Sequence, residues 1–548
     1  MSQSRVRGRG SVPQDTEERA PRAGGPREKG SGRGGGRGRG RGRGGKQGGR
    51  GGRRALRWSA SVLALLILGT AGAGYLYYQH LNGNIQRGAR TGSDDSRAER
   101  TRPNANGQTP LNILLIGSDS RASAENVKLG GSKDNRDNPP LGDVQMLIHV
   151  SADRRSAAMV SIPRDTRVDI PECKDAKTGK VYPPTNDIIN TTLARGGAGC
   201  TLATWENLTG VYIDHWMTID FAGVVRMADA IRGVDVCVNQ NVWDRSTAAQ
   251  RGGSGLKMTA GTHKVKGEQA LQWLRTRHAW GSDVMRARAQ HMYLNSMIRT
   301  LKGQNVFTDS GRLMDLAEAA TKSLTVSDEI SSVKKLYDLG MELKAVPTDR
   351  ITSVTMPNIE DPQNSSHVLP AQGGAGKLWQ MLREDVSLDK NGKPAKKTVA
   401  DAEPVKAPSA APERLGVQVR NGTRSDTLAP VSGRARAIAS ALGAKGYGQA
   451  QADTAAAPAT DETVVRYPSA DLEGDAQAVA KALGIPVKQV ERSTDVSGVT
   501  VVVGADWRTG DTYPEKAAPK AGDLPTGTDA INGSDDKSCM DVYKPYRW

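Results

Sequence analysis

Aromatic residues are scarce in this sequence: they make up 4% of its 548 residues, and only two of them are phenylalanine. Glycine and proline are abundant, at 63 and 27 residues. A chain of this length would form roughly three or four domains of about 150 residues each. With so few aromatics and so much glycine and proline, part of it cannot belong to a packed core. A single compact domain is therefore excluded, and so is a fully disordered chain.

Several catalytic signatures are also missing. The sequence has no GxSxG nucleophile elbow, no GxxxxGK[ST] phosphate loop and no HExxH zinc motif. Its seven histidines are scattered, and its four cysteines fit no zinc spacing. These absences argue against serine-hydrolase, P-loop and zinc-peptidase chemistry.

The formal charge of +17 is concentrated at one end of the chain. Residues 1–57 contain 15 arginines and 2 lysines against 4 acidic residues, so the rest of the chain carries a charge of only +4. This Arg/Gly-rich stretch has no apolar periodicity, and we expect a disordered tail that is attracted to anionic lipid head groups. RNA or DNA binding is the alternative. No aromatic residues are interleaved to stack on bases, so we do not expect a nucleic acid as partner.

Residues 58–78 form an uncharged run of 21 residues centred on VLALLILG. As a helix this run would be about 31 Å long, which matches the hydrocarbon thickness of a bilayer. Arg53, Arg54 and Arg57 precede it, so we expect the basic tail in the cytoplasm and the rest of the chain outside. The alternative is a signal peptide cleaved near Ala71, but the stretch before the apolar run is far too long for one. We therefore predict a single-pass, uncleaved membrane anchor.

The four cysteines are an even set, which suits an oxidising space outside the membrane. Cys173 and Cys200 flank a loop-rich stretch, and we expect them to form a disulfide. Four cysteines allow three pairings, so the pairing of Cys237 and Cys539 stays open, and buried free thiols are the alternative.

The outer part divides into five regions by composition. A polar tether comes first, followed by a stretch that alternates apolar strands with amphipathic segments, as in a mixed α/β domain with a central sheet flanked by helices. A Lys/Pro/Ala linker leads to a small strand–helix–strand–helix–strand module, and a polar tail that Cys539 would pin follows. The boundaries are 79–108 for the tether, 109–386 for the first domain, 387–412 for the linker, 413–507 for the small α/β domain and 508–548 for the tail.

Three strand-like segments of the first domain end or begin at charged residues. Leu111–Gly117 is a nearly continuous apolar run of buried-strand length, and Asp119 and Arg121 follow it. Val144–Val150 and Ser156–Ile162 are joined by a short polar turn, which is typical of a hairpin. A hairpin places the start of its first strand beside the end of its second. The residues that this hairpin brings together are Asp143, Arg164 and Asp165.

Two helices follow, which we expect at 267–278 and 282–301. Ser282 can cap the second helix, and an acidic residue suits its first turn. Spacings of three and seven residues place three polar side chains on one face of that helix. The polar residues of the two helices are Arg275, Arg277, Asp283, Arg286 and Gln290.

Carboxylates and guanidiniums in one place suit a polyanion held together with a divalent cation. Guanidinium groups bind phosphate oxygens in a bidentate manner, and two carboxylates with phosphate oxygens and waters form a usual Mg²⁺ shell. In phosphoryl transfer, positioning and charge neutralisation supply most of the rate. We expect Asp119 and Asp143 on the metal side. The phosphate clamp would be Arg121, Arg164, Arg277 and Arg286. Structural ion pairs are the alternative, because such pairs are common after strands.

Five motifs in a fixed order carry a resemblance to a known family. They are LNILLIGSDSR, DVQMLIHVS, MVSIPRDTRVDIP, LTGVYIDHWMTIDFAGVVRMADAIRGVDV, and KGEQALQWLRTRH followed by GSDVMRARAQ. Over residues 109–305 the chain resembles the LytR-CpsA-Psr family of cell-wall ligases. The 413–507 module, with VQVRNGT and VVVGADW, is similar to the LytR-type C-terminal domain often attached to that family.

The resemblance implies a single-pass protein of a bacterial cell membrane with an extracytoplasmic catalytic domain. That domain would bind a polyprenyl-pyrophosphate-linked glycopolymer of the teichoic-acid, arabinogalactan or capsule type. With Mg²⁺ as cofactor, it would transfer the phospho-glycopolymer to a muramic-acid hydroxyl of peptidoglycan and release polyprenyl phosphate.

The family's acidic and arginine positions fall on the residues singled out above. The resemblance implies catalytic roles for Asp119, Asp143, Arg164, Arg277 and Arg286. It implies phosphate binding by Arg121, Arg164, Arg275, Arg277, Arg286 and Gln290, and further family positions at Asp165 and Asp283. The sequence departs from the family at Leu141 and at Ala289, where arginines are usual; Arg288 lies next to the second position.

Three other functions stay open at this point. A hydrolase would use the same site with water as acceptor. A wall-polymer binding or scaffold protein would need no catalysis, and its Asp/Arg cluster would be structural. Regulation of transcription through the basic tail rests on the Arg/Gly tract alone.

Overall fold

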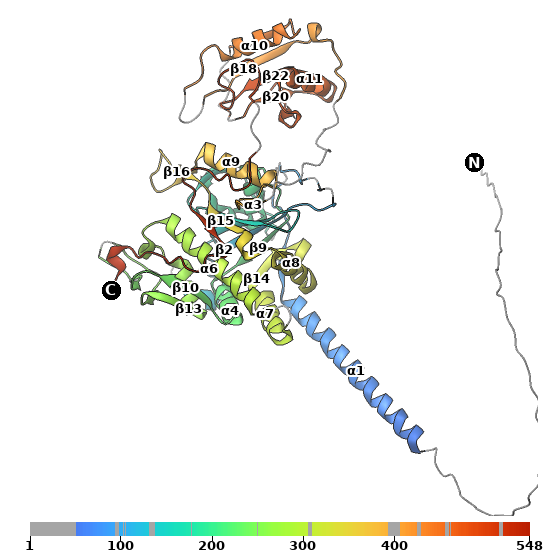
Figure 1. Cartoon of the computed structure of the whole chain (residues 1–548), viewed down its shortest axis with the longest axis vertical. Helices are drawn as coiled ribbons and strands as arrows, with labels where there is room; N and C mark the ends of the chain where they lie inside the picture. The colour runs from blue at the N-terminus through green and yellow to red at the C-terminus, as the bar shows by residue number, and fades with distance from the viewer. Residues whose placement is uncertain are drawn as a thin grey trace, which may run out of the picture. The chain divides into compact units, whose positions relative to one another are not determined.

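The computed structural model describes residues 51–548 apart from 94–97, 102, 105, 131–137, 177, 249, 305–308, 393–405, 425–428, 455–459, 461 and 515–518. Most of the expected basic tail and much of the expected linker therefore lie outside the described residues. Helix α1 (Gly51–Asn84) contains the apolar run (Figure 1). Among the described residues, only the segment Arg57–Asn84 of this helix is long and apolar enough to cross a membrane.

The first domain is built on an eight-stranded mixed sheet. In spatial order its strands are β1 (Gln86–Gly88), β14 (Leu324–Ser327), β9 (His215–Ile219), β2 (Leu111–Ser118), β3 (Gly142–Val150), β4 (Ala157–Ile162), β15 (Ile351–Thr355) and β23 (Ala530–Asn532). Strands β2, β3 and β4 are antiparallel neighbours, whereas β9 runs parallel to β2 and β15 parallel to β4. The predicted hairpin and the predicted mixed sheet are both confirmed.

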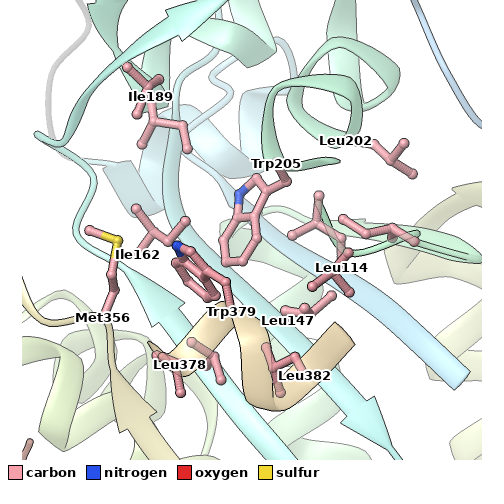
Figure 2. Close-up of a cluster of buried hydrophobic side chains, with 14 of the residues drawn as sticks. Leu114, Leu147, Ile162, Ile189, Leu202, Trp205, Met356, Leu378, Trp379 and Leu382 are labelled. Carbon is pink, nitrogen blue, oxygen red and sulfur yellow. The ribbon is translucent and has the colours of Figure 1, made fainter. Parts of the chain in front are cut away.

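Helices cover both faces of this sheet. On one face lie α3 (Thr192–Thr209) and α9 (Gln372–Arg383), and Figure 2 shows Trp205 and Trp379 of these helices beside Leu114 of β2. On the other face, α6 (Asp283–Gly303) and α8 (Val333–Ala345) cover Ile113 and its neighbours. Successive side chains of a strand point to opposite faces, so β2 needs apolar residues for both faces. Its polar Asn112 is buried and hydrogen-bonded to His149 and to the Tyr212 carbonyl.

Smaller elements complete the domain. Helices α4, α5 and α6 pack with the antiparallel pair β10–β13 around a core of their own. The bounds are α2 (Ala124–Gly130), α4 (Phe221–Ala230), α5 (Gly267–Arg275), α7 (Ser310–Ser323), β10 (Val234–Val238) and β13 (Gly261–Val265). Four short antiparallel pairs are β5 (Arg167–Ile170) with β8 (Thr185–Ile188), β6 (Cys173–Lys174) with β7 (Val181–Tyr182), β11 (Val242–Trp243) with β12 (Lys257–Met258), and β16 (Asn358–Glu360) with β17 (Val368–Pro370).

The residues that follow α1 are built into the domain, whereas we expected a free tether over 79–108. Leu81 is buried, and β1 pairs with β14 at the edge of the sheet. Arg90 forms an ion pair with the fully buried carboxylate of Glu206 at 2.7 Å. Polar composition did not predict this packing, because the sequence does not distinguish an arginine that is paired inside a domain from one in solvent.

The end of the chain also returns to the first domain, where we expected a polar tail over 508–548. Gly522 donates its N–H to the carbonyl of Ser387 at 3.0 Å, and β23 then extends the sheet beside β15. We call residues 522–548 the C-terminal segment. The chain leaves the first domain only after Asp389, which forms an ion pair with Arg350, and it re-enters the domain at Gly522. The small domain is therefore an insertion and not a terminal appendage.

Two disulfides stabilise this arrangement. The predicted bond between Cys173 and Cys200 is present and joins β6 to α3. The second bond joins Cys237 of β10 to Cys539 of the C-terminal segment, which pins the segment as expected. No free cysteine occurs in the described residues.

The small domain contains a five-stranded sheet with helices α10 (Arg434–Ala444) and α11 (Glu473–Leu483). The strand order is β19 (Ala450–Ala452), β18 (Val417–Asn421), β22 (Val499–Val503), β20 (Val464–Tyr467) and β21 (Val490–Arg492). It has its own buried core, which includes Val419, Val501 and Trp507. The strand–helix order predicted for 413–507 is present, with two additional edge strands.

Candidate active site

Asp119 follows the end of β2 and is fixed by the chain that enters β3. Its Oδ1 accepts a hydrogen bond from the N–H of Leu141 at 2.7 Å, and its own N–H donates to the Leu141 carbonyl at 3.1 Å. Burial raises the pKa of the Asp119 carboxyl, and the negative charge of Asp143 raises it further. The two carboxylates are therefore close enough to repel each other.

The β3–β4 hairpin brings Asp143, Arg164 and Asp165 together, as predicted. Its register pairs Gln145 with Ile162, so the start of β3 lies beside the end of β4. Arg164 donates from Nη1 to Asp143 at 3.0 Å and from Nε to Asp165 at 3.3 Å. Burial lowers the pKa of Arg164, but the two carboxylates more than offset burial and raise it above its ordinary value.

Asp283 gathers two arginines at the start of α6. Arg277 Nε lies 3.0 Å from Asp283 Oδ1, and Arg286 Nη1 lies 3.4 Å from the same oxygen. Ser282 caps α6 through its side chain, as predicted. The capped helix start thus carries one carboxylate between two guanidiniums.

Arg277 lies outside the helix that we expected over 267–278. Helix α5 ends at Arg275, and Thr276 adopts an extended backbone conformation. Arg277 then begins a turn that contains a short 3₁₀ helix, His278–Trp280. The expected helix was too long because a β-branched residue ends it one turn early.

Carboxyl groups connect the hairpin to α6. Asp283 lies close to Asp165: burial raises the pKa of the Asp165 carboxyl, and the neighbouring carboxyl of Asp283 raises it further. Burial lowers the pKa of Arg286, while Asp283 and Asp143 both act on it electrostatically in the opposite direction. Segments far apart in the sequence therefore meet in one charged cluster.

Arg121 and Arg275 extend the cluster. Arg275 donates to the carbonyl of Leu129 at 2.9 Å, and its guanidinium lies 4.6 Å from the centre of the Phe221 ring. Burial lowers the pKa of Arg275, and the positive charge of Arg121 lowers it further. Arg121 Nε is buried and has no hydrogen-bond partner among the described residues. An anion at this position would satisfy that nitrogen.

Two nearby residues are engaged elsewhere. Gln290 is 6% exposed, and its amide nitrogen donates to the carbonyl of Leu274 at 3.1 Å, which links α6 to α5. We therefore remove Gln290 from the predicted phosphate-binding set. Arg288, next to Ala289, pairs with Asp529 of the C-terminal segment. Arg288 thus has a partner of its own outside the charged cluster.

The cluster suits a phosphate-bearing ligand with a divalent cation. Its members are Asp119, Asp143, Asp165, Asp283, Arg121, Arg164, Arg275, Arg277 and Arg286. In the part of the chain that the structure describes, no three His, Cys, Asp or Glu side chains form a ready-made metal cage. Mg²⁺ needs only one or two protein carboxylates where phosphate oxygens complete its shell. Asp119 and Asp143, which repel each other, fit that requirement.

Two contacts of this site were not predicted from the sequence. The Phe221 ring contacts the Arg275 guanidinium in a cation–π interaction. Tyr543 of the C-terminal segment donates its N–H to the carbonyl of Ala279 at 2.7 Å, in the turn between the helices. Phe221 lies within the fourth family motif, but nothing in that motif indicates its partner. The one sequence signal for the second contact was Cys539.

The fold and the site define a mixed α/β domain that gathers arginines and aspartates at the ends of its strands and at a helix start. The LytR_cpsA_psr family model matches residues 77–384, which is more than half of the chain, and the chain belongs to this family. A second family model, described as LytR cell envelope-related transcriptional attenuator, matches residues 414–507.

Several characterised proteins are similar to this chain. The cell wall biosynthesis protein LcpA of Corynebacterium glutamicum is 28% identical over 484 residues, which cover 81% of this chain and 85% of LcpA. The polyisoprenyl-teichoic acid–peptidoglycan teichoic acid transferase TagT of Bacillus subtilis is 24% identical over 54% of this chain and 84% of TagT. The solved structure of TagT bound to LI-WTA is 21% identical, with a TM-score of 0.39 over 55% of this chain and 98% of that one.

Proposed function

We propose that this protein is a membrane-anchored transferase that attaches a phospho-glycopolymer to peptidoglycan. The donor would be the glycopolymer linked to polyprenyl pyrophosphate, and the acceptor would be a muramic-acid hydroxyl. Membership of the family and the similarity to TagT, which is named as a teichoic acid transferase, support this function. The glycopolymer itself is defined here by class, as an anionic polymer.

The observation that carries the proposal is the close approach of the hairpin to the start of α6, where the carboxyls of Asp165 and Asp283 are neighbours. This approach sets Arg164 of the hairpin near Arg286 of α6, so guanidiniums from both elements can bind one diphosphate. The unpartnered Nε of Arg121 adds a further donor.

Asp119 and Asp143 would hold Mg²⁺ against the diphosphate. The ion would neutralise the charge that develops on the phosphate oxygens. Its presence would also relieve the repulsion between the two carboxylates.

The transfer is a displacement at phosphorus. The acceptor oxygen forms a bond to the phosphorus that carries the polymer, and the bond from that phosphorus to the bridging oxygen breaks. Polyprenyl phosphate leaves with the bridging oxygen, and the arginines offset its growing negative charge. One carboxylate of the site, Asp119 or Asp143, accepts the proton of the hydroxyl.

The proposed location is the outer face of the cell membrane. Helix α1 would be the anchor, and the arginines before its apolar run favour a cytoplasmic N-terminus. The two disulfides support an oxidising space for the domain.

Variants of the full-length protein in detergent test this function. The assay follows a labelled sugar from a synthetic polyprenyl-pyrophosphate saccharide onto insoluble peptidoglycan. Asp143→Ala and Arg286→Ala should each lower attachment by at least about 100-fold, because Asp143 would hold the Mg²⁺ ion and Arg286 would bind the diphosphate. Excess chelator should have an effect of similar size.

Lys334→Ala is the matched control, since Lys334 forms an exposed ion pair with Asp338 on α8. It should leave attachment unchanged. Normal attachment by Asp143→Ala or Arg286→Ala would contradict the transferase proposal. Release of the label into solution, with none on peptidoglycan, would indicate a hydrolase.

A further inference from the structure

The C-terminal segment places an aromatic ring on the turn between α5 and α6. The backbone N–H of Tyr543 is fixed by its hydrogen bond to Ala279 at 2.7 Å. The side chain lies against Gly281, where an added Cβ would be 3.6 Å from Tyr543 Cβ and Cγ. Gly281 has a φ of +83°, a conformation that favours glycine. The turn therefore offers a bare backbone surface on which the ring rests.

Tyr543 is held firmly and remains accessible. Cys539, four residues earlier, is bonded to Cys237, and Tyr546, three residues later, is buried. The Tyr546 ring lies 6.4 Å from the Tyr543 ring and 6.0 Å from that of His278. Tyr543 itself is 54% exposed. A ring that is fixed before a ligand arrives loses little conformational entropy when the ligand binds.

The position of the Tyr543 ring near the charged cluster indicates which kind of ligand the ring would bind. The turn that Tyr543 contacts connects Arg277 to Asp283, so the ring lies next to the part of the site formed by this turn and the start of α6, which we call the helix side. A group attached to a diphosphate on Arg277 would lie within reach of this turn. A saccharide can lay its C–H face on an aromatic ring while its hydroxyls stay in water. An alkyl chain would instead require a buried apolar surface.

We propose that Tyr543 forms a saccharide-stacking subsite, which binds the sugar joined to the diphosphate of the donor. This inference rests on the proposed function, because the arginines must first hold the diphosphate. It gives the C-terminal segment a role in substrate selection. Residues 77–384, which match the family model, do not include this segment.

Binding of two probes to the full-length protein in detergent tests the subsite. One probe is polyprenyl pyrophosphate without a sugar, and the other is the same lipid pyrophosphate with one N-acetylglucosamine. Tyr543→Ala should weaken binding of the sugar-bearing probe by roughly threefold to tenfold, the effect expected of one aromatic contact, and leave the sugar-free probe unchanged. Tyr543→Phe keeps the ring and should keep both affinities. Equal losses for both probes, or no loss for the sugar-bearing one, would overturn the proposal.

Trp548→Ala is a matched control in the same segment. Trp548 is 51% exposed, but its indole N–H donates to Val242 and not to the turn. It should leave both affinities unchanged, and a loss equal to that of Tyr543→Ala would show general loosening of the segment and overturn the subsite.

Arg286→Ala separates the subsite from the proposed function. It should abolish binding of both probes, since Arg286 belongs to the diphosphate site. If both probes still bind with wild-type affinity, the proposed diphosphate site fails. The difference between the two probes in Tyr543→Ala is measured separately and decides the subsite alone.

Discussion

The site has a strand side and a helix side, and different forces hold them. On the strand side, Asp119, Asp143 and Arg164 stand at the ends of neighbouring strands, whose ladders and two buried faces fix the backbone. On the helix side, Arg277 lies in a turn between two helices. That turn receives a backbone hydrogen bond from Tyr543, near the end of the chain. One half of the site therefore depends on local strand pairing and the other half on a distant segment.

The largest effect is expected at Asp283, which joins the two sides. Asp283→Ala removes the common partner of Arg277 and Arg286 and the carboxyl next to Asp165. We expect attachment to peptidoglycan to fall by about 100- to 1000-fold, because several charges lose their position at once. Ser282→Ala is the control: it removes the helix cap at a cost of about 1 kcal/mol in stability but leaves the charges in place. If both variants lose the same activity, the helix start matters and the carboxylate does not.

A smaller effect on donor binding is expected from removing a disulfide, and it should differ between the two bonds. Replacing either pair of cysteines by serine should lower the free energy of unfolding by about 2–4 kcal/mol, measured by denaturant titration. Only the loss of Cys237–Cys539 frees the segment that supports the helix-side turn. We therefore expect KM for the donor to rise about fivefold to tenfold in that variant, since misplaced arginines bind the diphosphate less well.

The bond between Cys173 and Cys200 connects β6 to α3 and has no contact with the turn. Its removal should leave KM unchanged at a temperature where both variants are folded. An equal rise of KM in the two variants would contradict the idea that the helix side alone depends on the C-terminal segment.

The strand side was predictable because its geometry is local. A short turn between two apolar runs sets the register of a hairpin, and that register alone brings Asp143 to Arg164. The position of Asp119 was predictable because the apolar run that forms β2 ends just before it. These are short-range properties, which a single sequence contains.

The helix side was only partly predictable. The cap at Ser282 was visible, but the early end of α5 placed Arg277 in a turn. The contact from Tyr543 joins residues that no periodicity relates, so only Cys539 hinted at it. Gln290 lies on α6 as predicted. Its amide, however, donates to a backbone carbonyl, because the packing of α6 against α5 brings the two groups together.

The smallest predicted effect is on the strand side and concerns stability. Burial and the charge of Asp143 raise the pKa of Asp119 in the folded protein, so the folded state binds this proton more tightly than the unfolded state does. Stability is therefore lost as the pH rises from the ordinary aspartate range through the raised pKa, and the full cost is present at neutral pH. Asp119→Asn keeps an oxygen for the N–H of Leu141 and removes the charge.

Without added magnesium at pH 7, Asp119→Asn should raise Tm by roughly 1–3 °C in a thermal melt. The gain should shrink toward zero as the pH falls below the ordinary aspartate pKa of about 4, because the wild-type carboxyl is then protonated in both the folded and the unfolded state. Asp338→Asn, at an exposed position on α8, is the control and should give no such pH-dependent gain. A lower Tm for Asp119→Asn at neutral pH would mean that the charge of Asp119 stabilises the fold, and the strand side would then be a structural ion-pair network without a strained carboxylate pair.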